Sequence, residues 1–232
     1  MVRTFSASIG LALMFFGLFV GQTYAQATSP SLFEPVSGFL FLDLSELNQA
    51  LEANGFKSLQ TPMNFAGSWS LSKLGDWPVG ASLMQGGISA GEETRFAQMG
   101  IQLISLFAMA RFPISEYVVQ LQAFVSGGLA LGQAQLILTQ KSLDENNFGD
   151  VLKNPHDTNL SRSFVAALPR LGLELKFGDS VTLRGSVGYL WDFWDSSWTH
   201  LAQRIMGPPK NLNGVLIEFT FSYQLPTQSK KE

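Results

Sequence analysis

The chain of 232 residues has no cysteine, which excludes disulfide frameworks, thiolate metal sites and cysteine nucleophiles together. Charge is scarce as well: Asp, Glu, Lys and Arg make up 14% of the residues, whereas soluble domains usually carry about 25%. No stretch is strongly basic, which argues against binding to nucleic acid. Dinucleotide-binding, P-loop, HExxH and nucleophile-elbow motifs are missing too. The composition is instead strongly apolar, with 46% hydrophobic and 12% aromatic residues. No change in composition along the chain indicates a boundary between two domains.

The first 25 residues have the features of a secretory signal peptide. A positive charge at Arg3 precedes the apolar run Ile9–Val20, and Thr23 and Ala25 provide the small residues of an A-x-A-like cleavage site. A retained membrane anchor is the alternative, but the apolar run is short for a helix that spans a bilayer, which needs about 20 residues. We therefore expect cleavage after Ala25, export of the chain, and a periplasmic N-terminal segment over residues 26–37.

Period-two alternation of apolar and polar residues predicts that the rest of the chain forms β-strands. In the clearest segment, Gly214–Leu225, Val215 and Phe219 fall on one face while Glu218 and Thr220 fall on the other. The other predicted strands of this kind are Gly38–Asp43, Asn64–Leu71, Val79–Ser89, Ala97–Met109, Ser163–Phe177 and Val181–Trp191.

Tyr117–Gln140 is a longer candidate strand whose pattern changes part-way along. Its glutamines at positions 120 and 122 fall on one parity, and those at 133 and 135 fall on the other. The change occurs around Gly127–Gly128, which predicts a bulge in one long strand. A hairpin turn at the same place is the alternative. Counting the segment once gives about eight strands.

The gaps between the predicted strands alternate in length. Ser72–Pro78, Ala110–Glu116 and Gly178–Ser180 are short, whereas Leu44–Met63, Lys141–Arg162 and Asp192–Asn213 are long, and only Ala90–Phe96 breaks the trend. The first long gap predicts a short helix, with Ser45 as a possible N-cap, Leu47 and Leu51 on one side and Gly55 as its terminator. Short turns at one end and long loops at the other are typical of outer-membrane barrels. We therefore predict an all-β fold, an antiparallel transmembrane β-barrel of about eight strands over residues 38–225, followed by a polar tail over residues 226–232.

The polar parity of these strands predicts what fills the barrel. An eight-stranded lumen is only wide enough for side chains. Arg170 and Arg184 are expected to pair there with Glu174 and Glu218 from neighbouring strands. The alternative is that such residues face water on a soluble sheet. The full set predicted to project into the lumen is Arg170, Glu174, Lys176, Arg184, Glu218, Gln98 and Gln102.

In its strands, loops and polarity, Gly38–Leu225 resembles the small bacterial outer-membrane β-barrels of the OmpA-type class. The resemblance implies an outer-membrane location, outer-membrane lipid and the barrel assembly machinery as partners, and no cofactor. Two features depart from the class. A charged tail, Pro226–Glu232, follows the last strand where an aromatic residue often ends the chain, and Pro169 interrupts a strand, which suggests a local bulge.

Residues Trp191–His200 hold three of the five tryptophans, together with Asp195, Ser196 and His200. Such residues suit an aromatic girdle at the membrane surface, and a Ser–His–Asp catalytic group is the alternative. Because the girdle accounts for this stretch, we expect no enzymatic activity. We also expect no metal site, because no second His or Cys lies at ligand spacing from His156. The predicted girdle comprises Tyr189, Trp191, Trp194, Trp198 and Tyr223.

These observations favour a barrel with a structural or surface-interaction role and a lumen filled by side chains. A narrow channel or transporter for small solutes is the main alternative. A soluble, exported, lipocalin-like binder and a lipid-modifying barrel enzyme follow it.

Overall fold

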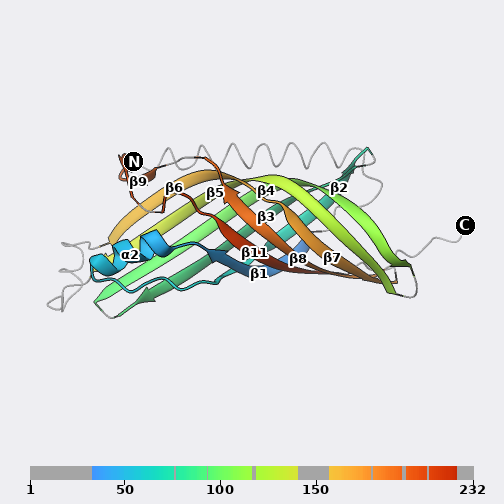
Figure 1. The fold of residues 1–232 in the computed structure, drawn as a ribbon, viewed down its shortest axis with the longest axis horizontal. Coiled ribbons are helices and arrows are strands. Elements are labelled where there is room, and N and C mark those ends of the chain that lie inside the picture. The colour runs from blue at the N-terminus through green and yellow to red at the C-terminus, as the bar shows by residue number, and fades with distance from the viewer. Residues whose placement is uncertain are drawn as a thin grey trace, which may run out of the picture.

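The computed structural model describes residues 33–75, 77–92, 94–116, 119–140, 157–178, 180–194, 197–207 and 209–223. Antiparallel strands make up most of these ranges, with one helix (Figure 1). The predicted signal peptide, most of the predicted loop Lys141–Arg162 (with His156) and the predicted polar tail lie outside them. The elements are β1 (Phe33–Leu42), α2 (Ser45–Ala53), β2 (Met63–Leu74), β3 (Trp77–Gly91), β4 (Arg95–Glu116), β5 (Val119–Gln140), β6 (Asp157–Ala167), β7 (Arg170–Phe177), β8 (Val181–Asp192), β9 (Trp198–His200), β10 (Gln203–Ile205) and β11 (Gly214–Tyr223).

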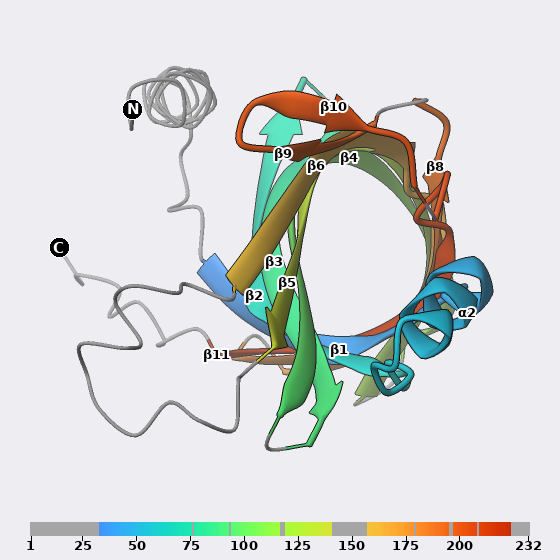
Figure 2. The same ribbon diagram turned by 90° about the vertical axis from the view of Figure 1, so that its left-hand side faces the viewer.

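The strands close into a ring of eight, in the order β1, β2, β3, β4, β5, β7, β8 and β11 (Figure 2). β11 pairs with β1, and β7 pairs with β5, so the ring has no free edge. Cross-strand partners can be followed once around the ring, from Gln122 of β5 through the other seven strands and back to β5. The path returns to β5 at Gly132, ten residues farther along the strand. This stagger requires tilted strands, as in closed barrels generally. The predicted antiparallel barrel is confirmed.

Two segments settle the strand count. β5 is one strand, and its register with β4 runs without interruption through Gly127–Gly128, so the predicted bulge there is wrong. The register of that pair shifts instead between Pro113 and Ser115 on β4. The segment Ser163–Phe177, predicted as one strand with a local bulge at Pro169, is instead divided at Leu168 and Pro169 into two strands. β6 and β7 lie end to end along β5 and together occupy one position in the ring.

Several strand boundaries also differ from those predicted, among them the start of β1 and the end of β4. β1 begins at Phe33, so residues 33–37, expected to be periplasmic, belong to the barrel. β4 continues to Glu116, well beyond Met109. Short connections join β2 to β3, β4 to β5 and β7 to β8 at what we call the turn end. α2 and the β9–β10 hairpin lie at the opposite, loop end (Figures 1 and 2).

α2 lies in the connection between β1 and β2, where a helix was predicted. The side chain that accepts hydrogen bonds at the first turn of the helix is Asp43, not the predicted Ser45. Asp43 Oδ1 accepts hydrogen bonds from the Ser45 hydroxyl at 2.7 Å and from the Ser45 N–H at 3.1 Å. These bonds, the hydroxyl's first, hold the pKa of Asp43 below its ordinary value. Leu47 and Leu51 are buried, and Gly55 follows the helix at φ +76°.

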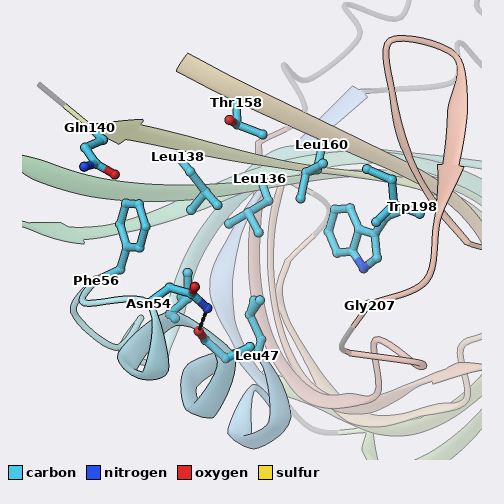
Figure 3. A pocket seen from close by; sticks show the side chains of 13 residues that line it. Leu47, Asn54, Phe56, Leu136, Leu138, Gln140, Thr158, Leu160, Trp198 and Gly207 are labelled. Carbon is cyan, nitrogen blue, oxygen red and sulfur yellow. Dashed lines mark hydrogen bonds between the residues drawn. The ribbon is translucent and has the colours of Figure 1, made fainter. Parts of the chain in front are cut away.

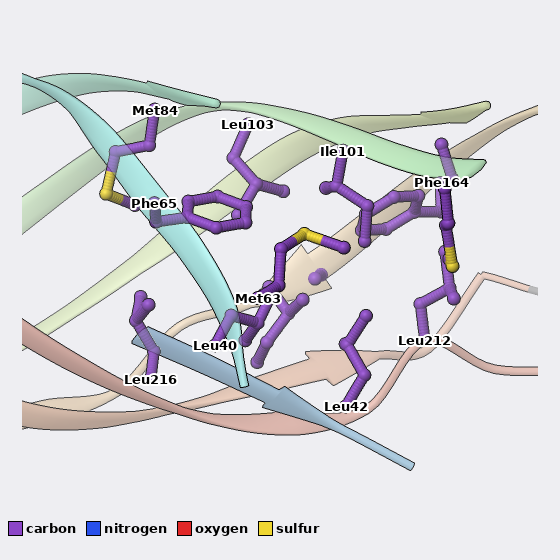
Figure 4. Packing of buried hydrophobic residues seen from close by; sticks show 14 of the residues in the cluster. Leu40, Leu42, Met63, Phe65, Met84, Ile101, Leu103, Phe164, Leu212 and Leu216 are labelled. Carbon is purple, nitrogen blue, oxygen red and sulfur yellow. The ribbon is translucent and has the colours of Figure 1, made fainter. Parts of the chain in front are cut away.

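The apolar core fills the half of the barrel nearer the loop end. Figure 4 shows Met63, Phe65, Leu103 and Leu216 converging from β2, β4 and β11. Glycines admit the larger rings: a Cβ on Gly132 would lie 2.1 Å from the ring of Phe164. Within the described ranges, no helix has the length and hydropathy needed to cross a bilayer.

Candidate functional site: a charged cluster inside the barrel

The half of the barrel nearer the turn end holds buried charged side chains. Period-two alternation places them inside, on the face opposite apolar neighbours such as Phe219 and Leu173. Glu174 is 0% exposed and Glu218 is 1% exposed. We define the charged cluster as Glu34, Arg111, Arg170, Glu174, Lys176, Arg184 and Glu218.

Two short ion pairs organise this cluster. Arg170 Nε donates to Glu218 Oε2 at 2.6 Å, and the Ser186 hydroxyl donates to the same oxygen at 3.3 Å. Arg184 Nε donates to Glu174 Oε2 at 2.7 Å. Arg184 Nη1 also bonds the carboxylate of Glu34, which ties β8 to β1. Charge-assisted bonds of this kind offset the cost of burying each charge.

Glu174 is shared among several cations. Besides Arg184, it lies 3.4 Å from Arg111 Nε and 3.2 Å from Lys176 Nζ. The Lys176 side chain is 34% exposed, so it reaches toward the turn end while Glu174 stays buried. With Glu218 and Glu34 engaged elsewhere, the cluster contains more cations than carboxylates, and each carboxylate has at least one cationic partner.

Aromatic rings lie against the guanidinium groups of two of these arginines. The Arg170 guanidinium lies 5.3 Å from the ring centroids of both Trp69 and Phe107, and Arg184 lies 5.7 Å from Trp69. Trp69 and Phe107 contact each other at 5.2 Å between centroids. Cation–π contact with the ring faces stabilises the buried cations and joins the charged cluster to the apolar core.

A second buried ion pair lies at the loop end. Arg162 Nη2 donates to Asp192 Oδ2 at 2.7 Å, and Arg162 Nη1 donates to the carbonyl oxygen of Pro209 at 2.7 Å. The N–H of Leu212 donates to the same Asp192 oxygen at 3.0 Å. The pair therefore fastens the segment before β11 to β6 and β8.

The predicted lumen residues divide into two groups. Arg170, Glu174, Lys176, Arg184 and Glu218 lie together in the charged cluster. The expectation for Gln98 and Gln102 is wrong: both side chains are exposed on the outer face of β4, while the intervening Met99, Ile101 and Leu103 are buried inside. The apolar side chains of β4 from Met99 to Leu103 therefore pack in the barrel's core and do not face lipid.

Four charged residues of the interior were not predicted: Glu34, Arg111, Arg162 and Asp192. Glu34 shares the inward parity of Val36 and Leu40, but the predicted periplasmic segment over residues 26–37 excludes it from the predicted barrel. Arg111 continues the inward parity of Phe107 and Met109 past the predicted end of the strand. No local pattern indicated that Arg162 and Asp192 would pair.

The predicted girdle also divides. Tyr189, Trp191 and Trp194 are exposed near the loop end of β8, and Tyr223 is exposed at the turn end of β11. Trp198 is 2% exposed, so its assignment to the girdle is wrong. It lies in β9, which folds onto β6 through the pair Ser161 and Thr199 and turns the indole inward. His200 Nδ1 lies 3.0 Å from the Asn159 carbonyl oxygen. The other two members of the alternative Ser–His–Asp group, Asp195 and Ser196, lie outside the described residues. The described residues contain no acidic or histidine cluster suited to a metal ion.

The outer face of the barrel is largely apolar. Leu106, Leu129 and Phe219 are 49%, 60% and 52% exposed. Toward the loop end, this apolar surface stops at glutamines on three adjacent strands, because Gln85 of β3 pairs with Gln102 of β4, and Gln102 pairs with Gln133 of β5. We call these three residues the glutamine row.

No protein-family model matches the sequence, and no curated protein sequence matches it. Similar solved structures include the N-terminal β-barrel domain of Pseudomonas aeruginosa OprF, with 14% identity and a TM-score of 0.33 over 83% of this chain and 100% of that one. A major outer membrane protein from Thermus thermophilus has 10% identity and a TM-score of 0.42 over 82% of this chain and 98% of that one.

Proposed function

We propose that the protein is an outer-membrane β-barrel with a structural or surface-interaction role and a lumen closed by its own side chains. The observation that carries the proposal is the combination of an edgeless ring with an exposed apolar outer face. A closed ring satisfies the backbone hydrogen bonds between strands and is stable in hydrocarbon. In water, the same exposed apolar surface would favour aggregation.

The height of the apolar surface supports the proposal. On β4 the outward side chains are apolar from Ile104 to Ile114, and the glutamine row begins two residues earlier, at Gln102. In a strand tilted by about 40°, ten residue steps rise about 25 Å along the barrel axis. The apolar band of outer-membrane barrels is about 25 Å tall. The glutamine row and Trp191 would then lie at one membrane surface, and Tyr223 would lie at the other.

The packing supports a closed lumen. The charged cluster occupies the part nearer the turn end, and the apolar core occupies the part nearer the loop end. An ion crossing such a barrel would have to break the ion pairs of the charged cluster and would then have to lose its hydration shell within the apolar core. A structural or surface role then follows, with outer-membrane lipid and the barrel assembly machinery as the proposed partners.

Two measurements test the proposal separately. Fractionation of cells should place the protein with the membranes and require detergent for its release; recovery in a detergent-free soluble fraction would contradict the location. The purified protein in planar bilayers should give no sustained conductance. Steady ion-selective currents would contradict the closed lumen and favour a narrow channel.

A further inference from the structure

A pocket of about 640 Å³ lies at the loop end, between α2, the ends of β5 and β6, and the β9–β10 hairpin (Figure 3). Small-molecule sites usually measure about 300–1,000 Å³. Leu136 and Leu138 line the pocket and follow Gln133 on β5, so they lie on the loop-end side of the glutamine row. The pocket is therefore outside the apolar band, where its contents can exchange with the aqueous phase.

The wall of this pocket suits a hydrocarbon chain. Leu47 and Leu51 of α2 and Leu136 of β5 are buried, and they join the pocket to the apolar core below. Leu160 of β6 and Trp198 of β9 complete the wall on the far side (Figure 3). Among the described residues that line the pocket, none is charged.

Polar groups gather at one end of the pocket. Figure 3 shows Asn54 and Gln140 on the side away from Trp198, with Phe56 between them. Arg95 is the register partner of Gln140, and Arg95 Nη1 donates to the carbonyl oxygen of Asn54 at 3.1 Å. No carboxylate among the described residues pairs with Arg95, and its guanidinium has further donors to offer.

At the opposite end, Trp198 Nε1 is buried and has no hydrogen-bond partner within the described residues. The indole lies between Leu160 and Gly207, with its nitrogen on the Gly207 side (Figure 3). Its emission should respond to whatever fills the pocket, which makes Trp198 a natural reporter of occupancy.

We propose that this pocket binds the single hydrocarbon chain of a free amphiphile with an acidic headgroup, of the fatty-acid class. The chain lies among Leu47, Leu138 and Leu160. The carboxylate lies at the rim, within reach of Arg95. A free amphiphile suits the position better than the acyl chain of a membrane lipid, because the pocket opens beyond the apolar band.

The test uses the full-length protein in nanodiscs, with brominated dodecanoic acid as the probe. Bromine quenches tryptophan on contact, so we expect saturable quenching that is largely lost in Trp198→Phe. Ala50→Phe fills the pocket from α2 and should weaken binding at least tenfold. Gln49→Phe adds the same ring to an exposed position of the same helix and should leave binding unchanged. Equal quenching in wild type, Trp198→Phe and Ala50→Phe would mean that the probe only enters the bilayer beside Trp191 and Trp194, and this result would overturn the proposal.

Native mass spectrometry with unbrominated ligands tests the chain and the headgroup. Each added methylene should tighten binding about fourfold until the pocket is full. Arg95→Gln should weaken dodecanoate binding about tenfold and leave dodecanol binding unchanged. If the variant weakens both ligands equally, the assignment of the acidic headgroup is wrong. Wild-type protein that retains a phospholipid or lipopolysaccharide, and does not exchange it for dodecanoate, would overturn the choice of a free amphiphile.

Discussion

Glu218→Ala should be among the most damaging single substitutions inside the barrel, because it leaves a buried cation without its counter-charge. Arg170 is 2% exposed, and Glu218 is the carboxylate that it contacts, through Nε at 2.6 Å and Nη2 at 3.4 Å. Glu174 cannot replace Glu218, because it already serves Arg184, Arg111 and Lys176.

The magnitude follows from the burial of both partners. Removing one member of a buried ion pair typically costs about 3–5 kcal/mol of unfolding free energy. The rings of Trp69 and Phe107 remain in contact with Arg170 and offset part of this loss, so we expect a cost of about 3 kcal/mol. Replacing both partners, with Arg170→Met and Glu218→Leu, should cost much less, because no unpaired charge is left buried. The double variant should therefore be more stable than Glu218→Ala.

The assay is urea unfolding of protein folded into lipid vesicles, followed by tryptophan fluorescence. The matched control is Glu92→Ala. Glu92 pairs with Lys57 at 2.9 Å, a similar distance, but the two side chains are 68% and 58% exposed. An exposed pair contributes little to stability, so the control should hardly move the unfolding midpoint. Equal shifts for Glu218→Ala and Glu92→Ala, or a double variant as unstable as the single one, would refute the reasoning.

Three further substitutions test other parts of the molecule. Leu106→Lys should impair folding into vesicles by about 2–4 kcal/mol, whereas Gln102→Lys, four residues away on the same outer face, should be nearly neutral; equal effects would contradict the boundary drawn at the glutamine row. Gly132→Val should cost about 1–3 kcal/mol in the same unfolding assay, because its side chain would enter the ring of Phe164, and a midpoint like that of the wild type would contradict this packing. Asp43→Ala should raise amide hydrogen exchange in α2 by an amount equivalent to about 0.5–1 kcal/mol. Because the pKa of Asp43 is lowered in the folded protein, its stabilising effect is present above the unfolded value of 3.8 and is lost as the pH falls through the folded value. The difference between wild type and Asp43→Ala should therefore vanish in acid, and a difference that persists there would contradict the role of the carboxylate.

The sequence predicts the barrel well where each strand separates an apolar outer face from a polar inner face. β8 and β11 are of this kind, and both begin where the alternation predicts. Arg184 and Glu218 could be placed inside because bulky apolar residues flank each of them. Pro169 itself marks an irregularity in the predicted strand, since proline cannot donate a ladder hydrogen bond, although the structure has a break there and not a bulge.

Trp198 could not be placed from the sequence, because its position depends on a hairpin within a loop. β9 and β10 are each three residues long. Leu201 and Ala202, which connect them, have positive φ angles, although neither residue type indicates such a turn in the sequence. The pairing of Ser161 with Thr199 joins residues that are far apart in the chain. Local spacing suggests a girdle for every tryptophan near Trp191, and only the tertiary contact turns Trp198 inward.

Gln98 and Gln102 were misplaced for a different reason, which concerns the long strands β4 and β5. Near the turn end these strands are apolar outside, at Leu106 and Leu129, and the lumen beside them holds the charged cluster. Near the loop end the arrangement is reversed: Gln102 and Gln133 are outside, and Leu103 and Ala134 are inside.

Period-two alternation continues across this reversal, so it reveals two faces without telling which one is inside. The change of glutamine parity along Tyr117–Gln140 is the trace of the same reversal, since the strand itself continues without a bulge at the glycines. The same strands thus present an apolar outer face, suited to lipid, near the turn end and a polar outer face, suited to water, at the glutamine row nearer the loop end. In the second part the apolar face points inward, as in soluble barrels that enclose apolar ligands. The pocket beside Leu138 and Trp198 lies in that part, where hydrophobic burial can stabilise a ligand and water can reach the rim.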